Sequence, residues 1–240
     1  MPRFFVDEKP QNGTVTVFGE DARHIARSLR MAVGEKITVC CSGTDYLCEL
    51  KKISDTAVVC EVISEEKSRE PGISLTLFQA LPKQDKLELI IQKSVELGAC
   101  EVVPVMTKRC IARPEKGQFD KKLDRLTRIS LEAAKQSGRG IIPTVSGIIS
   151  FDECLKRLQD FDLPLICYEK QGGKRLSELD FGGVKTVGLL IGSEGGFERE
   201  EAEKAVSAGA IPVWLGDRIL RCETAPLASI AIIMSLTGNI

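Results

Sequence analysis

The first 70 residues contain short runs in which apolar and polar positions alternate, which is the pattern of half-buried β-strands. β-Branched residues dominate these runs, and turn sequences such as "SGTD" separate them. The runs are TVTVF (14–18), KITVCC (36–41), YLCEL (46–50) and AVVCEVI (57–63). A short helix is expected at about 20–32. The pattern predicts a small barrel-like β domain over residues 1–70, and the charged, Pro- and Gly-containing stretch 64–72 is expected to be the linker.

After residue 72 the pattern changes to alternating strands and helices. Apolar strands are expected at 73–81, 100–106, 163–168 and 187–192. Helices are expected from about 84 to Gly98 and from 119 to Gly138, each glycine serving as a C-cap. Ser150 and Glu153 form a capping box for a further short helix. This alternation predicts an α/β domain over 73–240, with a parallel sheet covered on both faces.

The last expected helix, from about residue 223, is apolar almost all round. Its large apolar residues cannot share one stripe: Leu227, Ile230, Ile232, Ile233, Met234 and Leu236. Such a helix must be buried on several sides, by its own domain alone or also by a second subunit.

Composition excludes several classes of function. The chain has 240 residues, 43% of them hydrophobic, and a net charge of -1, so bulk charge does not indicate a nucleic-acid or membrane partner. Nine scattered cysteines show no C-x-x-C spacing, which favours reduced thiols in a cytoplasmic protein and no metal site. No apolar run resembles a signal peptide or a membrane span.

Two stretches near the C-terminus carry the candidate chemistry: "LLIGSEGGFEREEAEKA" (189–205) and "LGDRILRCETAPLAS" (215–229). The first has the strand, glycine turn and helix of a nucleotide loop, but it matches neither G-x-G-x-x-G nor a P-loop. Carboxylates crowd the helix N-terminus, where a phosphate would otherwise bind: Glu194, Glu198, Glu200 and Glu201. For Glu200 and Glu201 we favour simple complementation of the helix dipole. The loop suits a positively charged ligand without phosphate, and S-adenosyl-L-methionine fits that description.

Together the two stretches resemble the paired C-terminal motifs of the SPOUT RNA methyltransferases, most closely the RsmE family. The opening "PRFFV" and "HIARSLRMAVGEKI" are similar to that family's PUA-like N-terminal domain, and "LPKQDKLELIIQKSVELGACEVVPV" and "EAAKQSGRGIIP" are similar to its central blocks. Ser193 departs from the family's more frequent G-P-E-G-G. The resemblance implies a deep trefoil knot in the α/β domain, a homodimer, and methylation of N3 of a uridine in 16S (small-subunit) ribosomal RNA.

Methyl transfer to N3 needs a proton acceptor and a donor for the developing anion on the uracil oxygens. Arg221 and Arg139 are the expected donors, because a guanidinium stays charged and forks onto planar oxygens. Glu223 is expected either to accept the proton or orient Arg221, or to serve only as a carboxylate near the N-terminus of the last helix. The paired motifs predict a pocket for S-adenosyl-L-methionine, bounded by 190–196 and 215–225. Its expected cofactor-binding residues are Leu190, Gly192, Glu194, Gly195, Gly196, Leu215, Gly216, Ile219, Leu220, Arg221 and Ala225.

The RNA-binding surface is expected from local charge. Between Thr107 and Arg139 there are ten basic residues, including Lys116, against four acidic ones, including Glu115. On the long helix Lys121, Arg125, Arg128, Lys135 and Arg139 recur at helical spacing, apart from the apolar face. A solvated helix face is the alternative, but the basic loop "TKRCIARPEKG" favours phosphate contacts. The residues expected to contact ribosomal RNA are His24, Arg27, Arg30, Arg109, Arg113, Lys121, Arg125, Arg128, Gln136 and Arg139.

Two other classes of function stay open at this point. A non-catalytic RNA-binding protein could retain the SPOUT fold. A Rossmann-type oxidoreductase is disfavoured by the acidic loop and by the missing dinucleotide fingerprint.

Overall fold

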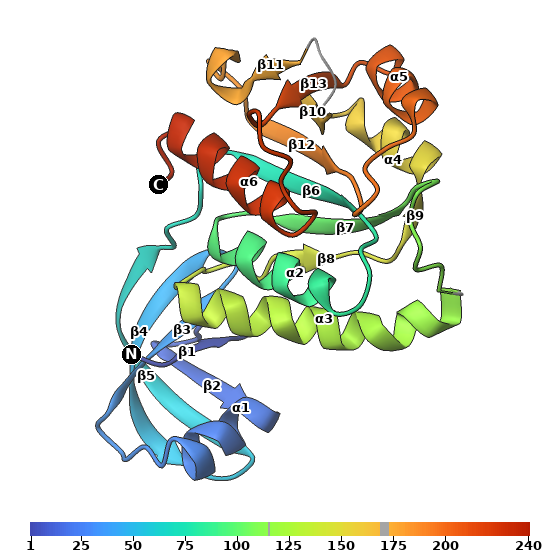
Figure 1. Cartoon of the computed structure of the whole chain (residues 1–240). Helices are drawn as coiled ribbons and strands as arrows, with labels where there is room; N and C mark the ends of the chain where they lie inside the picture. Colours follow the sequence, from blue (N-terminus) through green and yellow to red (C-terminus); the bar gives the residue numbers. More distant parts are fainter. Residues whose placement is uncertain (115, 169–172) are drawn as a thin grey trace. The chain divides into compact units, whose positions relative to one another are not determined.

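The computed structural model describes residues 1–114, 116–168 and 173–240 (Figure 1). Glu115, one of the acidic residues in the basic block, lies outside this range. The chain divides into two compact units, Met1–Glu70 with Ala134–Ile142, and Pro71–Ala133 with Pro143–Ile240. Residues 134–142 thus group with the first unit, although the sequence pattern had placed them in the α/β domain.

The first unit is built on one five-stranded sheet. Its strands are β1 (Arg3–Phe5), β2 (Thr14–Phe18), β3 (Lys36–Cys41), β4 (Thr44–Ile53) and β5 (Ala57–Lys67). They follow the order β1-β3-β4-β5-β2, in which β1 and β3 are parallel and the other pairs antiparallel. Alternate positions such as Ile37, Val39, Leu50 and Val58 are fully buried in its core, as the period-two pattern predicts. Since β5 continues to Lys67, the linker is shorter than expected.

The helix expected at 20–32 ends early and changes its winding. Helix α1 (Gly19–Arg23) leads directly into one π-helical turn, η1 (His24–Ser28). Arg30 then has a φ of +51°, in the left-handed region, which stops the helix. The expectation of one continuous α-helix was wrong because apolar spacing alone does not report a π turn.

The second unit contains a parallel sheet, as predicted. Its strands are β6 (Ser74–Ala80), β7 (Glu101–Met106), β8 (Thr144–Val145), β9 (Ile149–Ser150), β10 (Leu163–Cys167), β11 (Lys174–Arg175), β12 (Thr186–Ile191) and β13 (Ile211–Trp214). The order is β11-β13-β10-β12-β6-β7-β8, and β9 pairs with β7. Every pairing is parallel, so the carboxyl ends of the strands lie at one edge. The short strands β8, β9, β11 and β13 were not foreseen.

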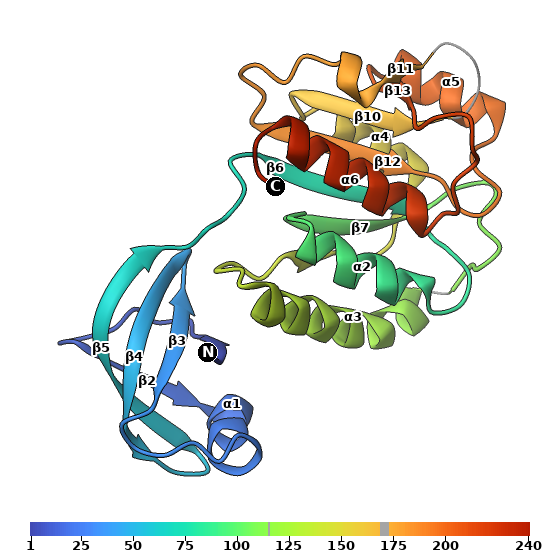
Figure 2. The ribbon, with the colours of Figure 1, turned by 60° about the vertical axis from the view of Figure 1, so that its left-hand side comes forward.

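Helices cover both faces of this sheet (Figure 2). They are α2 (Lys86–Glu96), α3 (Lys116–Ser137), α4 (Phe151–Leu158), α5 (Arg199–Ser207) and α6 (Thr224–Leu236), with a short 3-10 turn, η2 (Leu176–Glu178). Helices α4 and α5 pack on one face around Phe78, Val103 and Leu190, while α2 and α6 pack together on the other. The capping box of Ser150 and Glu153 is present at α4.

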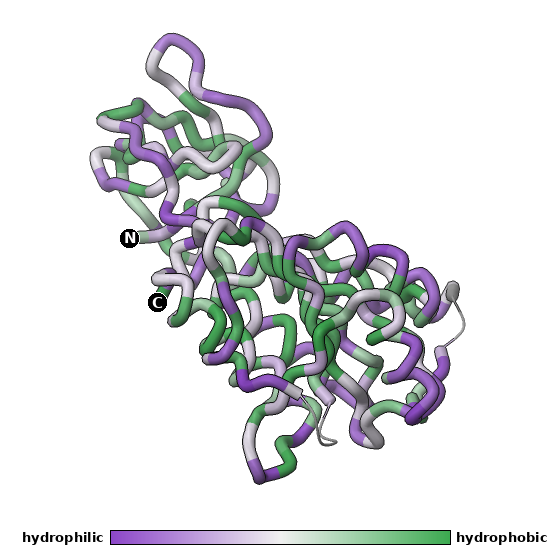
Figure 3. Tube along the Cα trace, turned by 90° about the horizontal axis from the view of Figure 1, so that it is seen from above, coloured by the Kyte–Doolittle hydropathy of each residue, from purple (hydrophilic) through white to green (hydrophobic). Residues whose placement is uncertain are grey.

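Helix α6 is apolar on all sides, as expected. Ile230, Ile233 and Met234 are fully buried, but Ile232 and Leu236 are 40% and 44% exposed. Hydrophobic and hydrophilic stretches are interspersed along the coloured trace (Figure 3). Within the described ranges no helix has both the length and the apolar character needed to cross a bilayer. All nine cysteines are free thiols, seven of them buried.

Candidate active site

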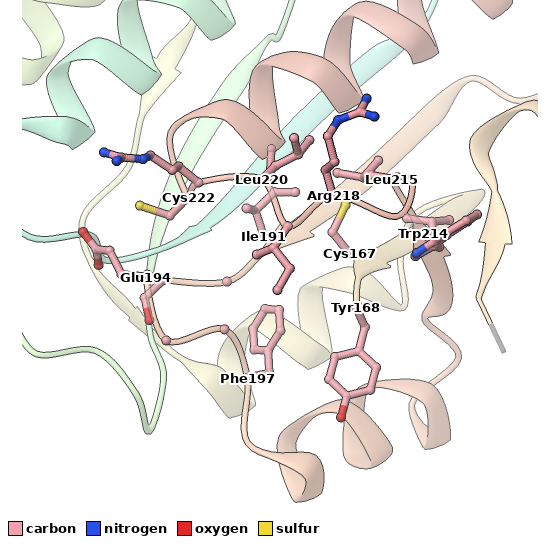
Figure 4. Close-up of a pocket in the computed structure, with 18 of the residues that line it drawn as sticks. Cys167, Tyr168, Ile191, Glu194, Phe197, Trp214, Leu215, Arg218, Leu220 and Cys222 are labelled. Atoms are coloured by element: carbon pink, nitrogen blue, oxygen red, sulfur yellow. The ribbon is translucent and has the colours of Figure 1, made fainter. Parts of the chain in front are cut away.

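A cavity of about 710 Å³ opens where β10, β12 and β13 end. Two segments form most of its wall: the glycine loop, residues 192–198 between β12 and α5, and the second loop, residues 215–223 between β13 and α6. Figure 4 shows the lining residues around the pocket, with Glu194 and Cys222 at one end and Trp214 at the other. The carboxyl edge of a parallel sheet is where such folds bind ligands.

Nearly all of the expected cofactor-binding residues line this cavity. They are Gly192, Glu194, Gly195, Gly196, Leu215, Gly216, Ile219, Leu220, Arg221 and Ala225. Leu190 is the exception, because its side chain points from β12 into the core under α4 and α5. The next residue, Ile191, lines the cavity instead, as strand alternation requires.

Asp217, Arg218 and Cys222 also line the cavity, within the predicted range 215–225, although they were not named as cofactor-binding residues. The lining residues outside both predicted ranges are Lys86, Arg109, Cys167, Tyr168, Phe197, Val213 and Trp214. A signal existed for two of them: Tyr168 ends the expected apolar run 163–168, and Lys86 lies in the block "LPKQDK", which follows β6. The guanidinium of Arg175 lies 5.2 Å from the Trp214 ring centroid, over its face.

The glycine loop is held in a tight turn. The Gly196 N–H donates to the Ser193 carbonyl at 2.9 Å, and Gly196 has a φ of +67°, which favours glycine. A Cβ at Gly192 would lie 3.0 Å from the Gly196 Cα, so a side chain there would require the turn to shift. Below the turn, Gln79 Nε2 donates to the Gly192 carbonyl at 3.1 Å.

The four carboxylates of the glycine loop and α5 have partners inside the protein. Glu201 is buried and accepts the N–H groups of Lys108 at 2.7 Å and Glu198 at 3.0 Å. Glu198 and Glu200 form ion pairs with Arg109 at 3.0 Å and Lys108 at 2.5 Å. The N-terminus of α5 is therefore capped by its own side chains, Glu198 and Glu201. The structural role favoured for Glu200 and Glu201 thus extends to Glu198.

Glu194 and Glu223 meet at one ammonium group. Lys86 Nζ lies 3.3 Å from Glu194 Oε1 and 3.0 Å from Glu223 Oε2. The hydrogen bond from Lys86 is the largest cause that lowers the pKa of Glu223. Partial burial would raise the pKa of Glu194, but hydrogen bonds from its own N–H, the Lys83 N–H and Lys86 outweigh burial and lower it. Both groups are thus carboxylates at neutral pH, and Glu223 is a weak base.

Cys222 lies beside this pair. Burial, then the hydrogen bond to Glu223, raises the pKa of its thiol to about 12. The thiol is therefore protonated at neutral pH and donates to Glu223 Oε2 at 3.2 Å.

Arg221 and Arg139, the two residues expected to donate hydrogen bonds to the uracil anion, lie in different surroundings. Arg221 is exposed and lines the cavity, and its guanidinium makes no hydrogen bond or ion pair to any residue in the described ranges. Its carbonyl accepts the N–H groups of Thr224 and Ala225, which fixes the start of α6. Arg139 belongs to the first unit, is only 6% exposed, and pairs with Glu70 at 2.6 Å. The structure thus gives Arg139 a structural partner and leaves Arg221 available.

The expected basic stripe on α3 is shorter than predicted. Lys121, Arg125 and Arg128 are exposed, and Arg125 pairs with Glu88 at 2.8 Å. Arg139 was wrongly placed on the stripe, since α3 ends at Ser137 and Arg139 is buried. Lys135 is largely covered and pairs with Asp21 at 2.9 Å. Gln136 is exposed in the last turn of the helix.

The other expected RNA contacts are divided between the units. Arg109 contacts the glycine loop as well as solvent. Its Nη1 donates to the Gly195 carbonyl at 2.7 Å, and the residue lines the cavity. Arg113 donates to the Lys108 carbonyl at 2.9 Å. In the first unit His24 and Arg30 are exposed, and Arg27 forms an ion pair with Asp55.

Two models of known protein families match the chain and define the class of protein to which it belongs. The model of the RNA methyltransferase domain matches residues 69–234, and that of the RNA methyltransferase PUA domain matches residues 19–63. The chain therefore belongs to the RNA methyltransferase family that carries a PUA domain.

Individual relatives narrow the comparison. The Ribosomal RNA small subunit methyltransferase E of Bacillus subtilis (strain 168) is 38% identical, covering 97% of this chain and 96% of the relative. The crystal structure of a Ribosomal RNA small subunit methyltransferase E from Neisseria gonorrhoeae bound to S-adenosyl methionine superposes with a TM-score of 0.87 at 32% identity, covering 98% of each chain. A putative methyltransferase from Legionella pneumophila, in complex with the cofactor SAM, has a TM-score of 0.87 at 27% identity over 98% of this chain and 97% of that chain.

Proposed function

We propose that this protein is a ribosomal RNA methyltransferase that uses S-adenosyl-L-methionine to methylate N3 of a uridine in 16S ribosomal RNA. The observation that carries this proposal is the shared cavity formed by the glycine loop and the second loop at the carboxyl edge of the sheet. The relatives that share the whole length of the chain support the substrate class.

The residues of the cavity fit the proposed cofactor. Its volume lies within the roughly 300–1,000 Å³ of small-molecule sites. Apolar side chains such as Ile191, Phe197 and Leu220 offer a surface for a purine, and Glu194 and Asp217 offer negative charge to a cationic ligand. The buried Ser193 Oγ has no hydrogen-bond partner in the described chain and lies in this wall. S-Adenosyl-L-methionine, when bound, supplies an electrophilic methyl group.

We assign to Arg221 the stabilisation of the negative charge that develops on the uracil. N3 of uridine becomes nucleophilic when it gives its proton to solvent water, and negative charge then spreads onto the two carbonyl oxygens of the uracil. The Arg221 guanidinium can donate to such an oxygen, because no described residue holds it. Glu223, held by Lys86, is better suited to organising the second loop than to taking the proton.

The function is tested by mass mapping of methylated nucleotides in ribosomal RNA from cells with and without the protein. We expect one methylated uridine of the 16S RNA to disappear, and to return when purified protein and S-adenosyl-L-methionine are added to small ribosomal subunits from the deficient cells. An unchanged methylation pattern together with retained RNA affinity would favour a non-catalytic RNA-binding protein.

We further propose that the protein works in the cytoplasm as a homodimer through α6, with a deep trefoil knot in the second unit. Exposed apolar side chains on the packed pair α2 and α6 support the dimer, namely Leu89, Ile232 and Leu236. Light scattering should give twice the chain mass for the wild type, and Ile232→Glu should give the single-chain mass. A wild-type monomer would contradict this part of the proposal.

A further inference from the structure

We propose that Lys86 is a positioning residue that clamps the two loops of the cofactor pocket together, so that the pocket is formed before the cofactor arrives. This inference rests on the proposed function for its ligand, but the clamp itself is a property of the protein alone. Lys86 lies in the connection between β6 and β7, far in sequence from both loops of the cavity.

The geometry of Lys86 carries the proposal. Its ammonium lies 3.3 Å from Glu194 in the glycine loop and 3.0 Å from Glu223 at the end of the second loop. The same nitrogen lies 3.8 Å from Cys222 Sγ. One cation therefore contacts two segments that a whole helix and strand, α5 and β13, separate along the chain.

The surroundings of the ammonium make these contacts stronger than ordinary surface pairs. The side chains of Lys86, Glu194 and Glu223 are 27%, 27% and 19% exposed, so solvent screens them only in part. Both carboxylates have a lowered pKa and Lys86 a raised pKa, mainly through the hydrogen bond to Glu223. Without the ammonium, two carboxylates and the thiol dipole would face one another without a counter-charge, and the loops would separate.

A second contact anchors the same device. The backbone N–H of Lys83 donates to Glu194 Oε1 at 3.0 Å, so a backbone group and the Lys86 ammonium hold the same carboxylate oxygen of the glycine loop. Lys86 itself begins α2, whose Leu87, Ile90 and Ile91 are buried in the core. The ammonium is thus presented from a rigid helix, which lets it fix the more exposed second loop.

The first experiment needs no cofactor. In the free protein Cys222 is 5% exposed, and its alkylation by N-ethylmaleimide reports opening of the second loop. We expect Lys86→Met to speed Cys222 labelling, followed by peptide mass analysis, by about tenfold or more. Lys86→Arg should restore slow labelling. The matched control is Lys93→Met, which removes an ion pair with Glu96 on the same helix outside the cavity, and it should not change the labelling rate.

The second experiment separates positioning from catalysis. Lys86→Met should raise the KM for S-adenosyl-L-methionine about tenfold, the size expected for losing one charge-assisted contact, while kcat at saturating cofactor changes less than about twofold. Lys86→Arg should recover most of the affinity. A kcat loss of about a hundredfold with KM unchanged would make Lys86 a catalytic group and overturn the clamp.

The two proposals fail in different ways. If the wild type does not bind S-adenosyl-L-methionine by calorimetry, the proposed function is wrong, and the labelling experiment still decides the clamp. If the wild type binds the cofactor but Lys86→Met binds it equally well and labels at the wild-type rate, the clamp is wrong and the function stands.

Discussion

The two loops that wall the cavity are held very differently. The glycine loop is fixed by side chains from three other segments: Gln79 at the end of β6, Lys86 at the start of α2 and Arg109 after β7. In the second loop residues 216–219 are exposed, with Ile219 83% exposed, and the loop is secured near its end by Cys222 and Glu223. The glycine loop is therefore a template wall, held by several segments, whereas the second loop is a responsive wall, held near its end and exposed at residues 216–219.

The largest expected effect comes from a comparison of two glycine-to-alanine substitutions, one in each loop. Gly192→Ala would place a Cβ 3.0 Å from the Gly196 Cα, and the fixed loop cannot move away. We expect cofactor affinity to fall more than about a hundredfold and stability to fall by about 1–3 kcal/mol, as for other overpacked sites. Gly216→Ala meets no atom within 4 Å and should do less in both measurements, despite its φ of +111°. Calorimetry and thermal unfolding provide the comparison, and equal losses would contradict it.

Arg221 tests whether the responsive wall also carries chemistry. Arg221→Lys keeps the charge but loses the planar fork, so single-turnover methylation at saturating cofactor should slow by about 10²-fold, with cofactor affinity unchanged. If affinity and thermal stability fell together while the rate held, Arg221 would be a structural residue of the loop.

Substitution of Arg109 tests whether this residue contacts RNA or supports the glycine loop. Its bonds to the Gly195 carbonyl and Glu198 predict that Arg109→Met weakens cofactor binding about tenfold. Arg113→Met, in the same segment but outside the cavity, is the control and should leave cofactor binding intact. A loss of RNA affinity alone in Arg109→Met would restore its role as a phosphate contact.

The exposed basic side chains of α3 should contribute to RNA affinity and not to cofactor affinity. Replacing Lys121 and Arg128 with Ser is expected to lower the log-log salt slope of RNA binding by about two units, roughly one for each lost phosphate contact, with cofactor affinity unchanged. Titrations between low and moderate salt measure the slope. An unaltered slope would mean that these side chains form only a solvated helix face.

The smallest expected effect is on acid stability. Glu194 and Glu223 have lowered pKa values in the folded protein, so the stability that they contribute is complete above the ordinary carboxyl pKa of 4.5 and is lost as pH falls through the lowered values. Unfolding midpoints of the wild type and of Glu223→Gln should converge as pH drops below 4.5. Curves that stay parallel throughout would show that Glu223 contributes no pH-dependent stability.

The regular elements were largely predictable, whereas the supports of the site were not. Strand β2 and the α4 capping box follow from local patterns that need no tertiary information. Gln79 gave no local signal, and Lys86 gave only its place in the block "LPKQDK", because their importance comes from a sheet order that places β6 beside β12. Arg139 shows the opposite error: helical spacing put it on an exposed stripe, but the chain turns at Gly138, with a φ of +78°, and buries it beside Glu70.

The acidic loop shows how a correct conclusion can follow from an incomplete reason. Four carboxylates were expected to repel phosphate by charge alone. In the structure Glu198 and Glu201 occupy the helix N-terminus themselves, and cations from distant segments neutralise their neighbours. Two N–H groups of the helix end, those of Glu198 and Glu201, already have carboxylate partners, which no count of charges along the sequence could reveal.

The position of Trp214 has a practical consequence. It is the single tryptophan of the chain, and its ring forms part of the cavity wall under the Arg175 guanidinium. Indole emission responds to nearby cations and to loss of water, so the protein contains its own optical label at the mouth of the pocket. Selective excitation would report events at this one wall without an added dye, against only two tyrosines in the background.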